Sequence, residues 1–191
     1  MSPRTTEQNI EIKKEKRTTI IDAALEVFAE KSFMGASVSM ITKKAGISKG
    51  LLYNYFESKE DLLIQIIHEG FDEFVHVFDP NKDGVLTTDE FEFFVDETFS
   101  LLKKDLPFWK LYFSIIVQPA VMALVQDKLM EFIGPFIQTL VEYYQKTGVK
   151  NPEAHAMLMG SIMDGVSLNY IMDPKNYPIE DVKKIIIDKF K

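Results

Sequence analysis

The sequence predicts an all-α protein, and three observations lead to this prediction. Apolar residues recur at helical spacing along almost the whole chain. No alternating apolar and polar pattern of any length competes with them, so strands are not expected. Proline and glycine separate the helical stretches. With 191 residues and an apolar fraction of 46%, the chain is long enough to bury a core in one large domain or two small ones.

The first expected helix shows the pattern clearly. Ile20, Ala24 and Phe28 follow the i, i+4, i+8 spacing, which predicts an amphipathic helix over about 10–31. The following helices are expected at about 38–45, 49–56, 59–78, 87–104, 107–117, 119–147, 152–172 and 178–190. The residues expected to break or end them are Gly46, Pro107, Pro119, Gly148, Pro152, Pro174 and Pro178. Pro135 falls inside one of these helices and is expected to kink it.

Charge is distributed unevenly along the chain. The formal net charge is −7, but residues 1–64 hold 10 Lys and Arg against 9 Asp and Glu, whereas residues 65–191 hold 12 against 20. An acidic body with a slightly basic head is expected when one end of a protein meets phosphates. Because basic N-termini are common, this pattern alone does not identify a partner.

Composition excludes several classes of protein. Cysteine is absent, which removes disulfides, thiolate catalysis and zinc–thiolate sites and fits a cytosolic protein. The polar stretch MSPRTTEQNIEIKKEKR has no apolar segment with a cleavage site, so it does not predict a secretory signal. No uncharged apolar run reaches the length of about eighteen residues that a transmembrane helix needs. We therefore expect a cytoplasmic protein without a membrane partner.

The stretch ASVSMITKKAGISKGLLYNYFESKEDLL contains the parts of a helix-turn-helix. Ser37 is placed to cap a helix whose Met40 and Ile41 point inward. Gly46 supplies a turn conformation that a side chain would resist, and Ser48 is placed to cap the next helix. The alternative is that three short helices pack together without contacting DNA.

The second helix of this pair, KGLLYNYF, has a buried side and an outward side. Leu52 and Phe56 are expected inside. The outward residues are Lys49, Leu51, Tyr53, Asn54 and Tyr55. They offer donors to base edges and phosphates, and apolar atoms to thymine methyl groups. Such a face is typical of a recognition helix that enters the major groove of double-stranded DNA.

The same stretch closely resembles the N-terminal signature of the TetR family of transcriptional regulators, T-V-x-x-I-A-x-x-A-G-V-S-x-G-x-L-Y-x-Y-F-x-x-K-x-x-L. The matching residues are Ile41, Ala45, Gly46, Ile47, Ser48, Gly50, Leu52, Tyr53, Tyr55, Phe56, Lys59 and Leu62. Thr42 replaces the usual alanine, and Ser39 and Met40 replace a more polar pair. The specific match covers about residues 17–63, and the remainder agrees only in length and helix count.

The resemblance implies a helix-turn-helix head followed by a helical regulatory body, about nine helices in all. The DNA-binding domain would span residues 1–60, and the effector-binding and dimerisation domain residues 61–191. Such a protein is a homodimer that binds a near-palindromic operator, most often as a repressor. Because one head carries little net positive charge, affinity is expected to depend on dimerisation.

The resemblance also implies individual DNA contacts. The residues expected to face DNA are Lys49, Gly50, Leu51, Tyr53 and Tyr55. The residues expected to touch phosphates are Ser37, Ser39 and Lys59. Asn54 points outward in the pattern and is a candidate contact to phosphate or base. For Lys13, Lys14, Lys16 and Arg17, contact with the DNA backbone and a merely solvated helix face remain equally open.

Residues 79–90, DPNKDGVLTTDE, match the EF-hand template D-x-[DN]-x-[DN]-G-x5-E at every position. Gly84 permits the sharp turn of such a loop, and aromatic residues flank it at the spacing of EF-hand helices. The expected ligands are Asp79, Asn81, Asp83, the carbonyl of Val85 and a bidentate Glu90. Because five or more protein oxygens converge, Ca²⁺ is expected ahead of Mg²⁺. No organic cofactor is expected.

Other interpretations of this loop remain open. A turn rich in Asx, proline and glycine between two helices is common without a metal. A bound cation would either bias the connection between head and body or be a permanent structural element. The alternative function for the chain is a calcium sensor or buffer whose head only resembles a DNA-binding domain. The single, unpaired loop argues against the sensor, and the recognition-helix face favours the regulator.

The second half of the chain is rich in aromatic residues and methionine. The candidates for a pocket that binds a small apolar effector are Phe108, Trp109, Tyr112, Phe113, Met122, Phe136 and Met163. For each of them, an ordinary place in the helical core is the simpler interpretation. The candidates for a dimer interface, chosen as small or apolar residues of the last two helices, are Ala156, Gly160, Ser161, Gly165, Val182 and Ile186.

No catalytic motif supports an enzyme. His68, His76 and His155 are scattered and lack partners at metal or triad spacing. There is no dinucleotide-binding fingerprint, no P-loop and no nucleophile elbow. The sequence therefore predicts a protein that is not an enzyme.

Overall fold

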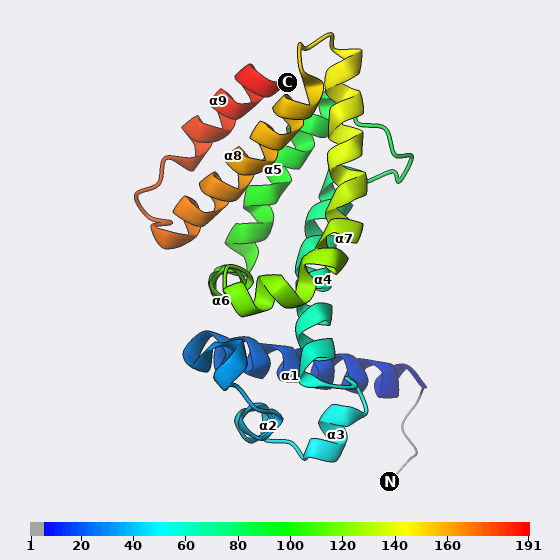
Figure 1. Ribbon diagram of the computed structural model, residues 1–191, viewed down its shortest axis with the longest axis vertical. Helices are drawn as coiled ribbons and strands as arrows, with labels where there is room; N and C mark the ends of the chain where they lie inside the picture. Colours follow the sequence, from blue (N-terminus) through cyan, green and yellow to red (C-terminus); the bar gives the residue numbers. More distant parts are fainter. Residues whose placement is uncertain (1–5) are drawn as a thin grey trace. The chain divides into compact units, whose positions relative to one another are not determined.

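The structure is a computed structural model that describes residues 6–191. Over these residues the chain forms nine helices and no strand, which confirms the all-α prediction (Figure 1). The helices are α1 (Thr6–Gly35), α2 (Val38–Ala45), α3 (Lys49–Tyr53), α4 (Lys59–Phe78), α5 (Thr88–Lys104), α6 (Leu106–Ile116), α7 (Pro119–Lys146), α8 (Pro152–Met172) and α9 (Ile179–Phe190). The bounds expected for α2, α4 and α8 are confirmed, and the other helices differ from expectation by a few residues at their ends.

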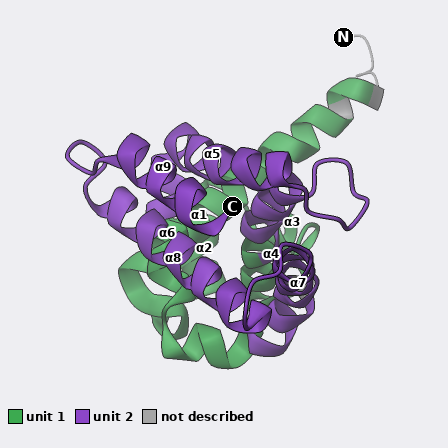
Figure 2. Ribbon diagram, turned by 90° about the horizontal axis from the view of Figure 1, so that it is seen from above, with its two compact units in different colours: residues 1–67, 111–125 green, residues 68–110, 126–191 purple. Residues whose placement is uncertain are grey.

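The chain divides into two compact units (Figure 2). The first consists of Met1–Ile67 and Leu111–Val125, and the second of His68–Lys110 and Gln126–Lys191. Three helices, α4, α6 and α7, contribute to both units. The domain boundary expected at residue 60 falls in the first turn of α4, and as a functional boundary it stays a prediction.

The core of the first unit joins apolar faces from helices that are far apart in the sequence. α1 contributes Ile20, Ala24 and Phe28, all with 0% exposed area. Further buried residues of this core are Ile41, Leu52, Phe56, Leu62, Leu63, Ile66, Ile115 and Val121. Each fully buried aliphatic or aromatic side chain stabilises the fold by about 1.5–3 kcal/mol. This core therefore holds α2 and α3, which are too short to be stable as isolated helices.

The core of the second unit is largely aromatic. The ring of Phe78 lies 5.1 Å from that of Phe94 and 4.1 Å from that of Phe136, measured between centroids. Phe91 stacks on Tyr143 at 5.4 Å. Because ring pairs add attraction to the burial of their area, these contacts hold α4, α5 and α7 together. α5 also packs against α8 and α9.

Two helices contain irregular positions. Ser32 interrupts α1 with φ 56° and ψ 163°, so the last turn of this helix leaves its axis. α7 continues as a helix on both sides of Pro135, and the expected kink stays a prediction. Among the described residues, no single helix is long and apolar enough to cross a membrane, although α6 and the first part of α7 reach that level together across a bend of 97°.

Candidate functional site

Three local contacts in the first unit build a helix-turn-helix. Ser37 Oγ accepts a hydrogen bond from the Met40 N–H at 3.3 Å and caps α2. Gly46 follows α2 with φ 64° and ψ 35°, a left-handed conformation that glycine adopts without steric cost. Ser48 Oγ accepts a hydrogen bond from the Leu51 N–H at 3.1 Å and caps α3. These contacts confirm the two caps and the turn that the sequence predicts.

The helix α3 is shorter than expected. It ends at Tyr53 instead of near residue 56, because the N–H groups of Asn54 and Tyr55 donate to the carbonyls three residues earlier, those of Leu51 and Leu52, and so tighten the last turn. Phe56 thereby turns inward and is 1% exposed, and Leu52 is 0% exposed. The turn that shortens the helix therefore also anchors it to the core.

Most of the predicted DNA contacts lie on the outer surface of α2 and α3. The exposed residues among them are Ser39, Lys49, Gly50, Tyr53 and Asn54. The half-buried residues are Ser37, Leu51, Tyr55 and Lys59. Lys49 and Tyr53 are one turn apart on α3, so an ammonium and a phenol hydroxyl share one face of this helix. Both groups donate hydrogen bonds of the kind made to phosphates and base edges.

Lys59, a predicted phosphate contact, has a second role that sequence reasoning missed. Its Nζ donates to the carbonyls of Phe33 at 2.9 Å and Ala36 at 3.0 Å. The same Nζ lies 4.2 Å from the centroid of the Phe33 ring. An ammonium has three donor hydrogens, so the two carbonyls use two of them, and the phosphate contact stays a prediction. Lys59 thus joins the start of α4 to the end of α1.

Arg17, which the sequence left open between DNA contact and solvent, has partners inside the head. Its Nη2 donates to Gln65 Oε1 at 2.8 Å, and its guanidinium lies 5.3 Å from the centroid of the Phe56 ring. The side chain therefore braces α1 against α4 and the turn after α3. DNA contacts by Lys13, Lys14 and Lys16, which are exposed on α1, stay a prediction.

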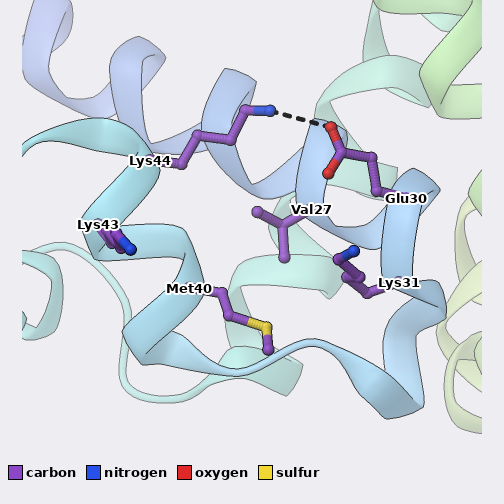
Figure 3. A pocket seen from close by; sticks show the side chains of 6 residues that line it. All are labelled: Val27, Glu30, Lys31, Met40, Lys43 and Lys44. Atoms are coloured by element: carbon purple, nitrogen blue, oxygen red, sulfur yellow. Dashed lines mark hydrogen bonds and ion pairs between the residues drawn. The ribbon is translucent and has the colours of Figure 1, made fainter.

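A hollow of about 440 Å³ opens between α1 and α2 (Figure 3). Its lining residues are Val27, Glu30, Lys31, Met40, Lys43 and Lys44. Met40, expected inward, is 44% exposed because Ile41 and Thr42 take the inward positions of α2. Hydrogen bonds to Glu26 and Glu30 raise the pKa of Lys44 and tie α2 to α1. The predicted DNA contacts are not among the residues that line this hollow.

The 79–90 loop contains two residues with left-handed backbone conformations. Lys82 and Gly84 have positive φ angles of 58° and 73°. The Asp79 carboxylate accepts hydrogen bonds from the N–H groups of Asp83 at 3.2 Å and Gly84 at 3.0 Å. Leu86 is 5% exposed and fastens the loop to the core. These contacts explain the loop's shape without a metal.

Two further polar side chains of the loop, those of Asn81 and Glu90, hydrogen-bond within the loop. Glu90 Oε2 accepts a hydrogen bond from the Thr87 N–H at 2.8 Å, which completes a capping box at the start of α5. Asn81 Nδ2 donates to Asp83 Oδ2 at 3.1 Å and Glu90 Oε1 at 3.0 Å. Nowhere in residues 6–191 do three or more His, Asp or Glu side chains form a group arranged to hold a metal ion. Calcium binding by Asp79, Asn81, Asp83, Val85 and Glu90 thus stays a prediction.

The candidates for an effector pocket are distributed over both units. Tyr112, Phe113 and Met122 belong to the first unit, and Phe108, Trp109, Phe136 and Met163 to the second. Trp109 is 3% exposed, its ring lies 4.8 Å from that of Phe74, and its Nε1 donates to the Leu101 carbonyl at 3.1 Å. Tyr112 is 4% exposed, whereas Met122 is 36% exposed. Several candidates therefore have packing roles, and their binding of an effector stays a prediction.

The candidates for a dimer interface do not share one surface. Ala156 and Ile186 are 1% and 3% exposed, so the structure places them in the core of their own unit and removes them from an exposed interface. Small and apolar side chains suit a core as well as an interface, and the interface itself stays a prediction. Gly160 and Gly165 face open space, since an added Cβ would meet no atom within 4 Å at either position. Ser161 is exposed and Val182 is half-buried.

Sequence reasoning missed an exposed apolar stripe on α8. The stripe consists of Met157, Leu158, Leu168 and Met172, which are 61%, 49%, 41% and 74% exposed. These residues, with Ser161 and Gly165 between them, recur at helical spacing on one face. Exposed apolar side chains that gather on one face of a helix favour association with a partner. Apolar residues occur on both the exposed and the buried face of α8. Only their exposed area distinguishes the two faces, and the sequence does not give this area.

Residues 20–66 match the family model described as bacterial regulatory proteins, tetR family. The matched segment contains most of α1, all of α2 and α3, and the start of α4. It is the part of the chain that forms the caps, the glycine turn and the recognition helix. The chain therefore carries an N-terminal helix-turn-helix domain of the tetR family.

Two relatives extend the similarity. The fatty acid metabolism regulator protein of Bacillus subtilis (strain 168) is 36% identical over 94 residues, which are 49% of this chain and 48% of that protein. The HTH-type transcriptional regulator UidR of Escherichia coli (strain K12) is 27% identical over 161 residues, 82% of this chain and 80% of UidR. The match to the first relative thus spans about half of its length. Both relatives are transcriptional regulators and not enzymes, as expected from the sequence.

The fold is similar to that of solved regulators. The transcriptional regulator FadR from Bacillus subtilis, in complex with stearoyl-CoA, superposes with a TM-score of 0.70 at 23% identity, over 91% of this chain and 96% of FadR. FadR from Bacillus halodurans superposes with a TM-score of 0.69 at 24% identity, over 92% and 94% of the two chains. The all-helical fold is therefore TetR-like.

Proposed function

We propose that the whole chain is a transcriptional regulator of the tetR family that binds double-stranded operator DNA in the cytoplasm, as a repressor. The observation that carries the proposal is the tetR-family match of residues 20–66, which contains the exposed face with Lys49 and Tyr53. The alternative of a calcium sensor without a role at DNA leaves this match unexplained.

The chemistry of the outward surface supports a division of roles on DNA. Lys49, Tyr53 and Asn54 present donors that suit base edges, and Leu51 offers apolar contact to a thymine methyl group. Ser39, at the start of α2, and the third donor hydrogen of Lys59 suit phosphates. Phosphate contacts fix the position of the protein, and base contacts select the sequence.

Selection of binding sites from a random duplex library, followed by fluorescence anisotropy with the selected site, tests the proposal. Lys49→Ala and Tyr53→Ala should each weaken binding by roughly 1–3 kcal/mol, which is about 5- to 150-fold. Lys146→Ala removes an exposed lysine of α7 and is a matched control that should bind like the unmodified protein. Enrichment of no site, or unchanged affinity in both recognition-helix variants, would refute the proposal.

A homodimer formed through α8 and α9 belongs to the same proposal. The exposed stripe of Met157, Leu158, Leu168 and Met172 supplies an apolar surface on α8, and Ile185 of α9 is 59% exposed. A head in which positive and negative charges almost balance binds DNA weakly alone. Two heads on a near-palindromic operator add their contacts.

The effector that we propose is a long-chain acyl-CoA. This ligand is the one bound to Bacillus subtilis FadR, to whose fold this chain is similar. Aromatic and methionine side chains such as Phe136 and Met163 suit an acyl chain, because they are apolar and adapt to its shape. The phosphates of CoA would remain nearer to solvent.

Control by Ca²⁺ is a second proposal, and it concerns the 79–90 loop. In its favour, Asn81 Nδ2 hydrogen-bonds both Asp83 and Glu90, so two carboxylates already lie within one hydrogen bond of the same group. Ligation requires that the Asn81 amide turn its oxygen inward and that Glu90 release the Thr87 N–H. A bound cation would neutralise the acidic side chains and stiffen the loop between α4 and α5.

A further inference from the structure

The break in α1 at Ser32 leaves backbone polar groups that need hydrogen-bond partners from outside this helix. Ser32 adopts φ 56° and ψ 163°, a region of backbone space that residues other than glycine rarely occupy. Such a conformation persists only where the surrounding structure imposes it. The rings of Phe28 and Phe33, on the two sides of the break, lie edge to face at 5.3 Å. Their apolar contact does not satisfy the polar backbone groups beside the break.

The side chain of Gln118 satisfies those groups. Its Oε1 accepts a hydrogen bond from the Phe33 N–H at 2.9 Å, and its Nε2 donates to the Phe28 carbonyl at 3.4 Å. One amide thus bonds a residue on each side of Ser32. No side chain without both a donor and an acceptor reproduces this pair of contacts.

The position of Gln118 is set by the corner between α6 and α7. Its own N–H donates to the Ile115 carbonyl at 3.1 Å. Its carbonyl accepts from the N–H groups of Val121 at 2.9 Å and Met122 at 3.0 Å. These backbone hydrogen bonds fix the position of Gln118, so its side-chain amide does not move with the end of α1. It holds that end where the corner places it.

Hydrogen bonds continue from Phe33 to the helix-turn-helix. The Phe33 carbonyl accepts from Lys59 Nζ at 2.9 Å, and Lys59 also donates to the Ala36 carbonyl at 3.0 Å. Ala36 directly precedes Ser37, the cap of α2, and Lys59 is the first residue of α4. All these residues belong to the first unit. A continuous series of polar contacts thus runs from the α6–α7 corner to the starts of α2 and α4.

We propose that Gln118 is a positioning residue for DNA binding, a role that rests on the proposed function. Because Gln118 fixes the backbone conformation at Ser32, it also fixes the direction in which the chain runs from the last turn of α1 into α2. The phosphate-contacting start of α2 and the recognition helix behind it then keep one arrangement. A shift of the α6–α7 corner would break these hydrogen bonds or move the end of α1, and α2 and α3 would change position with it. The Gln118 amide thereby links the conformation of the corner to operator affinity.

Three variants test this role by anisotropy with the selected operator. Gln118→Ala removes both contacts and should weaken binding roughly tenfold, since the 2.9 Å bond to Phe33 and the weaker 3.4 Å bond to Phe28 are lost. Gln118→Glu keeps the acceptor for Phe33 but loses the donor for Phe28, so it should also weaken binding. Gln138→Ala is the matched control and should have no effect, because Gln138 is an exposed α7 residue that donates to Glu142 of the same helix.

Rescue separates positioning from general damage. Ser32→Gly removes the backbone strain at the break, so the conformation no longer depends on the amide. In the Gln118→Ala background, Ser32→Gly should restore most of the lost affinity, although it does not restore a general packing defect. Amide exchange of the Phe33 N–H, measured without DNA, should accelerate in Gln118→Ala.

The outcomes are distinct for the two proposals. If the unmodified protein binds no selected operator, the proposed function fails and this inference fails with it. If the unmodified protein binds but Gln118→Ala binds equally well, or if Ser32→Gly restores nothing, only the role of Gln118 is refuted. Unchanged exchange of the Phe33 amide would refute it as well.

Discussion

At the scale of single residues, Lys59 serves the fold and the proposed DNA contact with one ammonium group. Two of its donor hydrogens bond to the carbonyls of Phe33 and Ala36. Both carbonyls lie near the end of α1, where a helix leaves its last carbonyls without intrahelical partners. A positive charge is favourable there because the carbonyl end of a helix is electronegative. A lysine in this place is therefore held still before any DNA arrives.

The change Lys59→Met separates these two roles. Methionine keeps much of the apolar stem but loses the donors, so the free energy of unfolding should fall by about 1–3 kcal/mol. Operator binding should weaken for all sequences alike, and the dependence of affinity on salt should flatten by about one phosphate contact. Denaturant unfolding and anisotropy at several salt concentrations measure the two effects.

The control for this experiment is Lys31→Met, which removes another lysine of the head. Lys31 is exposed, and its removal should leave the free energy of unfolding unchanged. If Lys59→Met were as stable as Lys31→Met, the carbonyl contacts would contribute nothing to the fold. If it were unstable but bound DNA with the normal salt dependence, Lys59 would be purely structural.

At the scale of elements, the 79–90 loop offers two uses for the same oxygens. Without metal, Glu90 completes the capping box with Thr87 and thereby stabilises the start of α5. With Ca²⁺, the same carboxylate would become the bidentate ligand of the site. The affinity for the cation is therefore lowered by the hydrogen bonds that the loop already makes.

Calorimetric titration of metal-stripped protein with Ca²⁺ should show saturable binding. At a hundredfold excess over the dissociation constant, the folded state should gain roughly 2.7 kcal/mol. Glu90→Gln should abolish most of this gain while keeping the cap, because glutamine also serves in a capping box. Asp89→Asn, which removes a neighbouring charge outside the ligand set, is the control and should still bind.

If the titration gives no heat and the melting temperature does not shift up to millimolar Ca²⁺, the loop does not bind Ca²⁺ and is only a turn between α4 and α5. If Ca²⁺ binds but operator affinity is the same with and without it, the ion is a structural element. Only a difference between these two affinities identifies Ca²⁺ as a regulator.

The stripe on α8 leads to a prediction about assembly. Leu168→Glu places a charge in the middle of the apolar face, so it should prevent the proposed dimer from forming and should lower operator affinity. Ala156→Glu, on the buried side of the same helix, should instead unfold the second unit, because it buries an unpaired charge. Gln145→Glu adds a charge at an exposed α7 site and is the control. Light scattering and circular dichroism distinguish these results, and a persistent Leu168→Glu dimer would place the interface elsewhere.

At the scale of the whole molecule, α4, α6 and α7 each contribute residues to both compact units. A ligand that moves one end of such a helix in one unit therefore also acts on the other end, which belongs to the other unit. Such coupling is reciprocal, so an effector that weakens DNA binding must itself bind less tightly to the DNA-bound protein.

The proposed effector makes this coupling measurable. Stearoyl-CoA should raise the melting temperature by mass action and should lower operator affinity. Coenzyme A without an acyl chain is the control and should do neither, because it has no apolar chain to bury. If stearoyl-CoA bound without changing operator affinity, it would be a ligand but not an effector. If neither compound shifted the melting temperature, the acyl-CoA proposal would be wrong, while DNA binding would remain untested by this result.

Local chemistry explains why the helix-turn-helix was predictable. A serine cap and a glycine with positive φ act within three or four residues, so their effects are contained in the local order of the chain. For the same reason the bounds of α2 and α4 agree with expectation. The early end of α3 was missed, because burial of Phe56 in a distant core draws the chain out of the helix.

Long-range contacts account for the remaining differences. The bonds of Gln118 to α1 span 85 and 90 positions of the chain, and no local pattern announces them. Likewise, the sequence shows that α8 is rich in small and apolar residues, but it does not show which face of α8 is buried. Ala156 and Leu168 are both apolar, and only their surroundings in the folded chain make one buried and the other exposed. Helix types, caps and the family of the head follow from neighbouring residues. The orientation of each helix, and with it the partners of Lys59 and Gln118, follows from packing among segments that meet only in the folded chain.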